Sequence, residues 1–425
     1  MNTNKTLINK ILITLGFLFC YRVLAYVPVP GVNVSVIKEF FDNNSNNALG
    51  LFNMFSGGAA ERLSIISLGI MPYITASIIM ELLTATFPNL GKMKKERDGM
   101  QKYMQIIRYA TIGITLVQAI GVSIGLQNFP SSRGESAILE GMLETGLFIP
   151  ITCISMLVGT MLLMWIGEQI TQRGIGNGIS LVIFAGIVSG IPSAIGNLFT
   201  SVNVGEMNFL IVILILLVMF VTIGIIIYIE MGERRIPISY SRKVIMQNQN
   251  KRIMNYIPIK VNLSGVIPPI FASAILMFPS TILQASTNKY VMMINDLLNP
   301  SGWFFHFLSF LFVIFFAFFY ASIVFNAKDI SENLKRQGGF IPGVRPGEST
   351  AGFLNDVAGK LTIWGSLYLG LVTTIPWLLT NFMHAPFYFG GTSVLIVISV
   401  ALDTMRRIEA QVYMNKYQTL SAVGL

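Results

Sequence analysis

Charged side chains are scarce in this chain of 425 residues, at 12%, where an ordinary soluble protein has about 25%. Hydrophobic residues make up 53% of the chain, and the mean hydropathy is +0.66. This balance argues against a soluble globular protein and places most of the chain in a lipid bilayer.

The chain has only two cysteines and two histidines. Cys20 and Cys153 both sit inside apolar runs, where cysteine behaves as a small apolar residue. No ligand spacing surrounds either histidine, so we expect no metal site and no disulfide. The glycines at 174–180 follow no strand and lack the dinucleotide spacing, so we expect no nucleotide or other cofactor.

Ionisable residues are few inside the apolar runs, which matters because a coupled transporter uses them to bind substrate or relay protons. Arg22 lies near one end of its run, where water or a partner carboxylate can reach it. Glu81 is a candidate for a proton relay, but a carboxyl that faces a wet crevice or shares a hydrogen bond with a serine or threonine is the favoured explanation. No paired catalytic groups occur, so we expect no enzyme, and a ten-span secondary transporter is retained as the alternative function.

Ten apolar runs are near the length of about 20 residues that a membrane-spanning helix needs. The runs do not alternate, which excludes a barrel, and backbone groups in lipid must be satisfied within a helix. The predicted fold is therefore an all-α polytopic membrane protein, with spans at 11–29, 67–87, 104–126, 147–166, 179–198, 209–229, 263–283, 303–325, 357–379 and 389–402.

Lysine and arginine collect in alternate loops, after the second, sixth and eighth spans and in the C-terminal tail. The positive-inside rule places these loops and both termini in the cytoplasm. Two of the loops, 231–262 and 326–352, are longer than topology requires. They suit an anionic partner such as ribosomal RNA or an acidic protein, while anionic lipid headgroups explain the same charge bias.

The spans divide as five plus five, which suggests an N-terminal half at 1–200 and a C-terminal half at 201–425. An odd number of spans per half inverts the second half relative to the first, as in other inverted repeats with a site at their interface. Several spans begin or end with glycine, proline and branched aliphatic residues. Close helix packing explains this pattern, and a ring of aliphatic side chains that gates a pore explains it too.

Five stretches carry a family resemblance, and they occur in order along the chain. They are "FNMFSGGAAERLSIISLGIMPYITASIIM" at 52–80, "MWIGEQITQRGIGNGIS" at 164–180, "KVNLSGVIPPIFASAI" at 260–275, "GFIPGVRPGEST" at 339–350 and "PFYFGGTSVLIV" at 386–397. With these stretches the chain resembles the SecY family, the central subunits of bacterial protein-conducting channels, over essentially its full length.

The resemblance implies two inverted five-helix halves around a central pore, with a short plug helix before the second span. The implied pore ring consists of Ile70, Ile74, Ile187, Ile270 and Ile396. The implied plug falls on 51–64, with Leu51, Phe52, Met54, Phe55, Gly57 and Gly58. On composition alone this stretch fits an interfacial helix equally well, but its place on the outer side, directly before Ile70, favours the plug.

The resemblance also implies a lateral gate between the second and seventh spans, for which we select Ile78, Glu81 and Ser273. Glu81 departs from the glutamine expected in the family. A carboxyl at this position suggests the hypothesis that gating depends on pH.

The implied function is translocation of unfolded secretory polypeptides across the bacterial cytoplasmic membrane and lateral release of membrane segments into lipid. The implied partners are SecE, SecG, the motor ATPase SecA, the ribosome, signal sequences and nascent polypeptides, together with anionic lipids. Docking of the cytoplasmic partners is expected at Arg234, Arg235, Lys251, Arg252 and Arg345. At the tip of the first docking loop, Gln247 and Asn248 stand where arginines are expected.

Overall fold

The computed structural model describes residues 3–43, 53, 56–127, 137–139, 146–203, 209–240, 256–283, 302–383 and 391–422. The first half of the chain forms α1 (Thr3–Leu24), α2 (Val34–Asn43), α4 (Met71–Thr86), α5 (Pro88–Lys95), α6 (Arg97–Gln127), α8 (Phe148–Arg173) and α9 (Gly178–Asn203). The second half forms α10 (Phe209–Met231), α12 (Ile267–Leu283), α14 (Trp303–Val324), α15 (Ala327–Arg336), α16 (Glu348–Met383) and α17 (Gly391–Ala422).

Each predicted span coincides with one helix, namely α1, α4, α6, α8, α9, α10, α12, α14, α16 or α17. Among the described helices, seven are long and apolar enough to cross a membrane, and α4 and α12 are shorter apolar helices. The 16 residues of α4 span about 24 Å, less than the roughly 30 Å of a bilayer core. Its first six residues are all buried, so protein rather than lipid surrounds this end of the helix.

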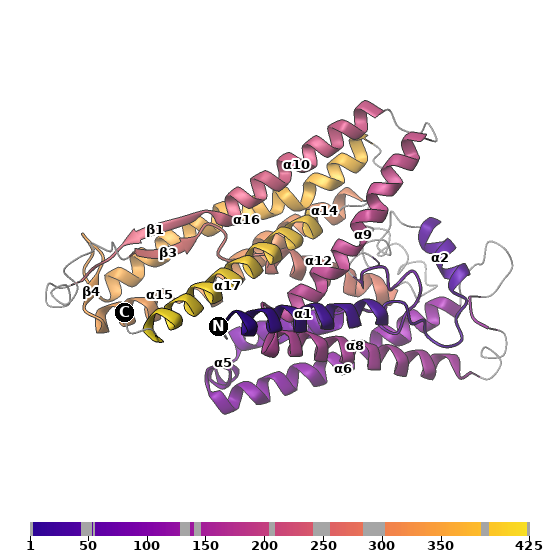
Figure 1. Cartoon of the computed structure of the whole chain (residues 1–425), viewed down its shortest axis with the longest axis horizontal. Coiled ribbons are helices and arrows are strands. Elements are labelled where there is room, and N and C mark those ends of the chain that lie inside the picture. Colours follow the sequence, from indigo (N-terminus) through magenta and orange to yellow (C-terminus); the bar gives the residue numbers. More distant parts are fainter. Residues whose placement is uncertain are drawn as a thin grey trace.

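The long helices form two groups that lie side by side (Figure 1). In one group α8 packs against α1 and α6, and in the other α16 packs against α14 and α17. The helices α4 and α12 pack against each other and so join the two groups. Toward one end of the molecule lie the labelled ends of the chain, the strands and α15, while α2 lies toward the opposite end (Figure 1). This arrangement agrees with the predicted orientation.

Four short strands build a small folded unit outside the helix groups. β1 (Glu233–Pro237) pairs antiparallel with β3 (Tyr256–Lys260), and β2 (Ser239–Tyr240) pairs antiparallel with β4 (Gly339–Phe340). The second pair joins the loop after α10 to the loop after α15. We call β1 to β4 together with α15 the strand platform.

Three hydrophobic clusters stabilise these parts. The largest lies among the spanning helices, and the second joins α2 to the outer ends of α6 and α8. The third is the core of the strand platform, where Ile236 and Ile259 meet Leu334 and Ile341. The described parts of the two long basic loops therefore form one folded unit with its own core, which the sequence did not predict.

Helix ends differ from the predicted spans where hydropathy and helix do not coincide. α1 ends at Leu24 rather than at residue 29, because the chain then turns and pairs with the segment before α4. α16 begins nine residues before the predicted span, and α17 continues to Ala422. Charged residues limit the apolar run but do not end a helix, since lysine, arginine and glutamate are good helix formers.

Candidate functional site

The five predicted ring residues come from four helices and share one hydrophobic cluster. Ile70 and Ile74 lie one turn apart at the start of α4 and hence on the same face. Ile187 of α9 and Ile396 of α17 are almost fully buried, and Ile270 of α12 is partly buried against the same cluster. All five isoleucines thus belong to, or pack against, the large cluster that runs through both helix groups.

The predicted plug is described in part. Leu51, Phe52, Met54 and Phe55 lie outside the described residues. Gly57 and Gly58 have positive φ angles of 70° and 81°, a backbone conformation that glycine adopts without the steric cost of a Cβ. The following residues Ala59 and Ala60 are 0% and 2% exposed, so the segment after the glycines is seated inside the protein.

The turn at Gly57 is held by backbone contacts with α1 and α9. The Tyr21 hydroxyl donates to the Ser56 carbonyl at 3.2 Å, and Arg22 Nη1 donates to the Gly57 carbonyl at 2.8 Å. A Cβ added to Gly57 would lie 2.6 Å from the Tyr21 hydroxyl oxygen and 2.8 Å from the Cα of Gly186. Gly186 directly precedes the ring residue Ile187, so the plug turn lies against the backbone next to the ring.

The base of the plug is fixed by short backbone pairing with the segment after α1. Val29 N donates to the Leu63 carbonyl at 2.9 Å, and Ile65 N donates to the Val27 carbonyl at 3.0 Å. On the other side, the Cα of Gly159 in α8 lies so close to the Ile65 carbonyl that no Cβ fits between them. Leu63 has a φ of 42°, so the fixed base itself contains a residue with a strained backbone.

Two arginines lie over the ring of Tyr26, just beyond α1. The Arg62 guanidinium carbon is 4.2 Å and that of Arg22 is 5.7 Å from the ring centre. A hydrogen bond from Arg62 and the charges of both arginines lower the pKa of the Tyr26 phenol below its usual value. Arg62 also pairs with its neighbour Glu61 at 3.3 Å, within the predicted plug segment. Arg22, in contrast, reaches that segment from α1.

The predicted lateral gate lies between α4 and α12, which pack against each other. Ile78 is 1% exposed and shares its cluster with Ala272 of α12. Ser273 donates to the carbonyls of Pro269 and Ile270 within its own helix. The interface between the described parts of the two helices is thus mainly apolar.

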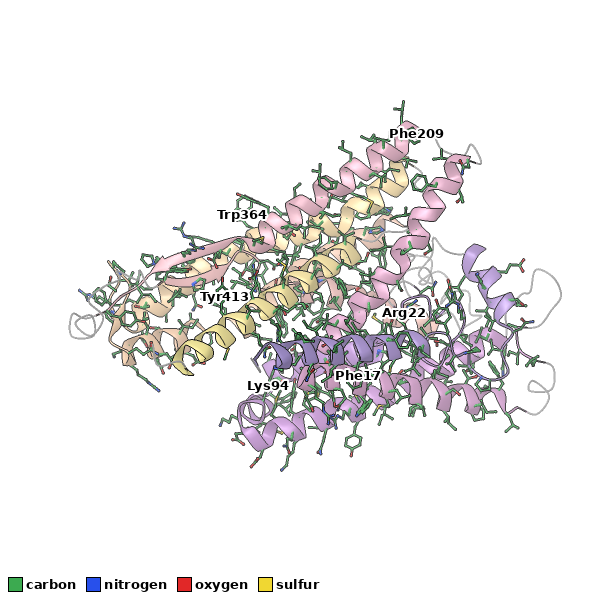
Figure 2. The ribbon with its side chains drawn as sticks, viewed as in Figure 1. Phe17, Arg22, Lys94, Phe209, Trp364 and Tyr413 are labelled. Carbon is green, nitrogen blue, oxygen red and sulfur yellow. The ribbon has the colours of Figure 1, made fainter. Side chains whose placement is uncertain are left out.

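Glu81 lies near the end of α4 that leads into α5. Its Oε1 is 4.0 Å from Lys94 Nζ, and its Oε2 is buried without a hydrogen-bond partner. Figure 2 shows Lys94 at the end of the molecule where α5 lies. The contact of this carboxylate is therefore a long ion pair with α5, and no direct bond to the described part of α12 is present.

Of the predicted docking arginines, Arg234 and Arg235 lie on β1 of the strand platform, and Arg345 lies in the segment between β4 and α16. Arg234 and Arg345 are exposed. Arg235 pairs with Glu233 at 2.6 Å and lies over the Tyr256 ring at 4.9 Å. The hydrogen bond that Arg235 donates to Glu233 raises the pKa of Arg235 above its usual value. The predicted docking residues Lys251 and Arg252 lie outside the described residues.

A polar cluster below the platform was not predicted. Asn262 donates from Nδ2 to Glu230 Oε1 at 2.6 Å, and Arg406 of α17 donates to the Glu230 carbonyl at 3.2 Å. These bonds tie α10 and α17 to the segment that enters α12. The sequence offered one sign of this cluster, a glutamate at the end of an apolar span. Its asparagine partner is 32 residues away, so the pair could not be recognised from the sequence.

Comparisons with known proteins agree with this geometry. The family model described as SecY matches residues 64–405. The protein translocase subunit SecY of Helicobacter pylori strain 26695 is 68% identical over 99% of this chain and 100% of its own length. The protein of the same name from Escherichia coli K12 is 39% identical over 97% of this chain and 93% of its own.

Solved structures match the fold at low sequence identity. A protein-conducting channel aligns with a TM-score of 0.69 at 20% identity, covering 96% of this chain and 93% of the channel. A SecY protein whose plug domain stabilises the closed state aligns with a TM-score of 0.68 at 20% identity, with the same coverage of 96% and 93%. Sec61 from the canine ribosome–channel complex aligns with a TM-score of 0.64 at 19% identity, again covering 96% and 93%.

The fold defines the class first: the chain is a polytopic helical membrane protein with the protein-conducting channel fold. The full-length relatives and the family model then define the family. The chain belongs to the SecY family of protein translocase subunits.

Proposed function

We propose that this chain is the channel subunit of a bacterial protein translocase. It lets unfolded secretory polypeptides cross the cytoplasmic membrane and releases apolar segments sideways into lipid. One observation carries this proposal beyond family membership: the plug turn at Gly57 lies against Gly186, the neighbour of the ring residue Ile187. Two closing elements therefore meet at one place in the protein.

The ring of Ile70, Ile74, Ile187, Ile270 and Ile396 is proposed as the constriction. A translocating chain presents polar and apolar residues in any order, so the constriction must not bind side chains tightly. Branched aliphatic side chains make few directional contacts, and a ring of them closes a pore by expelling water. Their common cluster supports this role.

The segment 51–64 is proposed as the plug, displaced when a chain enters. Its described part supports this role because two features set it apart from the protein that it contacts. Its glycines allow the chain to bend, and its base is fixed at Leu63 and Ile65. A fixed base lets the plug leave and return to the same seat.

The contact between α4 and α12 is proposed as the lateral gate, with Ile78, Glu81 and Ser273 on it. A signal sequence that reaches this seam gains roughly 25 cal/mol per Å² of apolar surface moved out of water. A mostly polar segment gains too little and continues across. The apolar character of the described seam supports this partition.

The strand platform is proposed as the docking site for the ribosome and SecA, through Arg234, Arg235 and Arg345 and the undescribed Lys251 and Arg252. Exposed arginines on a folded unit suit RNA phosphates or acidic protein surfaces. No ATPase motif occurs in the sequence, so SecA, the ribosome or the proton-motive force supplies the energy. SecE, SecG and anionic lipids complete the proposed partners, with signal sequences and nascent chains as substrates.

The proposed location is the bacterial cytoplasmic membrane, with both termini in the cytoplasm and functional halves at 1–200 and 201–425. The position of both chain ends near the strand platform supports this orientation (Figure 1). Membership of a translocase family argues against the secondary transporter alternative and against an enzyme.

Depletion of the protein in cells tests the proposed function. A general channel predicts that many unrelated secreted precursors accumulate with their signal sequences uncleaved. Loss of uptake or efflux of one solute, with normal processing of precursors, contradicts the proposal and restores the transporter.

A further inference from the structure

We propose that Arg22 is a positioning residue that holds the plug closed and makes its release depend on movement of α9. This inference rests on the proposed plug function and names the contact that regulates it. Figure 2 shows Arg22 on α1, near the end of that helix away from the N-terminus.

A continuous chain of hydrogen bonds runs from the plug to the ring. Arg22 Nη1 donates to the Gly57 carbonyl at 2.8 Å and to Ser189 Oγ at 2.9 Å. Ser189 Oγ in turn donates to the Gly186 carbonyl at 2.6 Å. The chain therefore starts on the plug backbone and ends one residue before Ile187.

The chemistry of these bonds suits a latch. The guanidinium carries a permanent charge, and a hydrogen bond from a charged donor is stronger than one between neutral groups. The acceptor on the plug is a backbone carbonyl, so the contact does not depend on any plug side chain. Tyr21 adds one neutral bond, to the carbonyl of Ser56.

The geometry couples the latch to the ring. Ser189 and Ile187 belong to the same helix, α9, so a movement of α9 that widens the ring also moves Ser189. Because one nitrogen, Nη1, makes both bonds, Arg22 cannot follow Ser189 and stay on Gly57. The plug is then held only by its weaker contacts when the ring opens.

An arginine outside the plug provides a matched control. Arg108 of α6 donates to the Glu168 carboxylate of α8, from Nε at 3.2 Å and from Nη2 at 2.7 Å. Arg22→Gln removes the charged donor from the Gly57 carbonyl, whereas Arg108→Gln removes a guanidinium of the same kind away from the plug. Ser189→Ala removes only the link to α9.

The experiment measures how fast a cysteine on the plug is labelled from outside. Ala60→Cys places the probe at a residue that is 2% exposed, and Cys20 is replaced by alanine. Cys153, which is buried in the second cluster, stays as an internal reference. A membrane-impermeant maleimide is added to the outer face of resting cells, and labelling at each position is quantified by mass spectrometry.

We expect Arg22→Gln to speed labelling of position 60 about 10- to 100-fold, as loss of a charged hydrogen bond implies. Labelling of Cys153 stays unchanged, Arg108→Gln behaves as wild type, and Arg22→Lys restores part of the protection. Ser189→Ala gives a smaller increase, and combining it with Arg22→Gln adds nothing, because both act on one contact.

Two outcomes overturn the proposal. If position 60 is labelled as slowly in Arg22→Gln and in Ser189→Ala as in wild type, the proposed contact does not hold the plug. The proposal also fails if labelling of Cys153 speeds up as much as labelling of position 60. If Arg22→Gln does not assemble, Ser189→Ala alone decides between the two results. Deletion of residues 55–60 distinguishes failure of the Arg22 proposal from failure of the plug proposal. If the deletion makes the resting channel leak ions and Arg22→Gln does not change labelling, only the Arg22 contact is rejected. If the deletion causes no leak, the plug itself is rejected.

Discussion

The Cα of Gly186 lies so close to Gly57 that a Cβ on Gly57 would come within 2.8 Å of it. The plug turn and the helix that carries Ile187 thus touch through their backbones. Such contact leaves no room for a side chain at Gly57, and it makes the seat of the plug sensitive to any shift of α9.

Gly57→Ala is expected to unseat the plug. The added Cβ meets both Gly186 and the Tyr21 hydroxyl, and the positive φ disfavours alanine. Gly58→Ala is the matched control, because its φ is also positive but its nearest neighbour, Glu61 Oε1, lies at 3.6 Å. Resting ion conductance in planar bilayers should rise well above wild type for Gly57→Ala and only slightly for Gly58→Ala. Equal conductance in the two variants contradicts the tight seat.

Glu81→Gln is expected to remove a pH dependence of gating. The carboxylate pairs with Lys94 of α5 at 4.0 Å, and Tyr103 of α6 and Tyr320 of α14 also face it. Protonation at low pH removes the attraction to Lys94, so wild-type export into inverted vesicles should rise as pH falls. Glu81→Gln should give a flat profile at the level of the acid form. Parallel profiles for the two proteins, measured with the same motor and precursor, refute the hypothesis.

Asn262→Ala is expected to destabilise the cluster below the strand platform. The change leaves the half-buried Glu230 carboxylate without its amide donor, which costs about 1–3 kcal/mol. Lys360→Ala removes an exposed ion pair with Asp356 instead and should cost less than about 1 kcal/mol. Thermal unfolding in detergent measures both. An unchanged midpoint for Asn262→Ala would show that the cluster contributes no stability.

Arg345→Ala is expected to weaken ribosome binding without affecting the fold. The Arg345 side chain is exposed. The backbone carbonyl of Arg345 accepts a hydrogen bond from the Thr350 hydroxyl at 2.8 Å, which the substitution leaves in place. Loss of one phosphate contact should lower the slope of log affinity against log salt by about one unit. Arg173→Ala, an exposed arginine at the end of α8, is the control. A salt slope equal to wild type argues against an RNA partner at this position.

The spans could be predicted from the sequence because a long apolar run in lipid must form a helix, in which the backbone N–H and C=O groups hydrogen-bond to one another. Helix ends could not be predicted in the same way. Hydropathy marks the end of the apolar run near residue 402, while α17 continues to Ala422. The positive-inside rule predicts that both chain ends lie on one side of the membrane, and Figure 1 draws their labels toward the same end of the molecule.

The ring and the place of the plug came from family motifs, since nothing in a single sequence shows that Ile187 and Ile396 meet. Their common cluster depends on helix packing between distant segments. The strand platform was missed for a similar reason. Its second strand pair joins Ser239 to Phe340 across about a hundred residues, and two-residue strands have no readable periodicity.

Arg22 was recognised as unusual, but its partners were not. The sequence suggested water or a carboxylate, whereas the structure provides the Gly57 carbonyl and the Ser189 hydroxyl, 35 and 167 residues away. Backbone acceptors leave no signature in a sequence. Such a contact can be found only once the fold brings the plug turn to the end of α1.

Deletion of residues 55–60 most directly tests the claim that a displaceable plug closes the channel. Resting conductance in planar bilayers and export of a precursor into vesicles are measured on the same preparation. We predict a leaky channel that still exports, because the ring and the lateral gate remain in place. Conductance equal to wild type after the deletion would contradict a plug at this position.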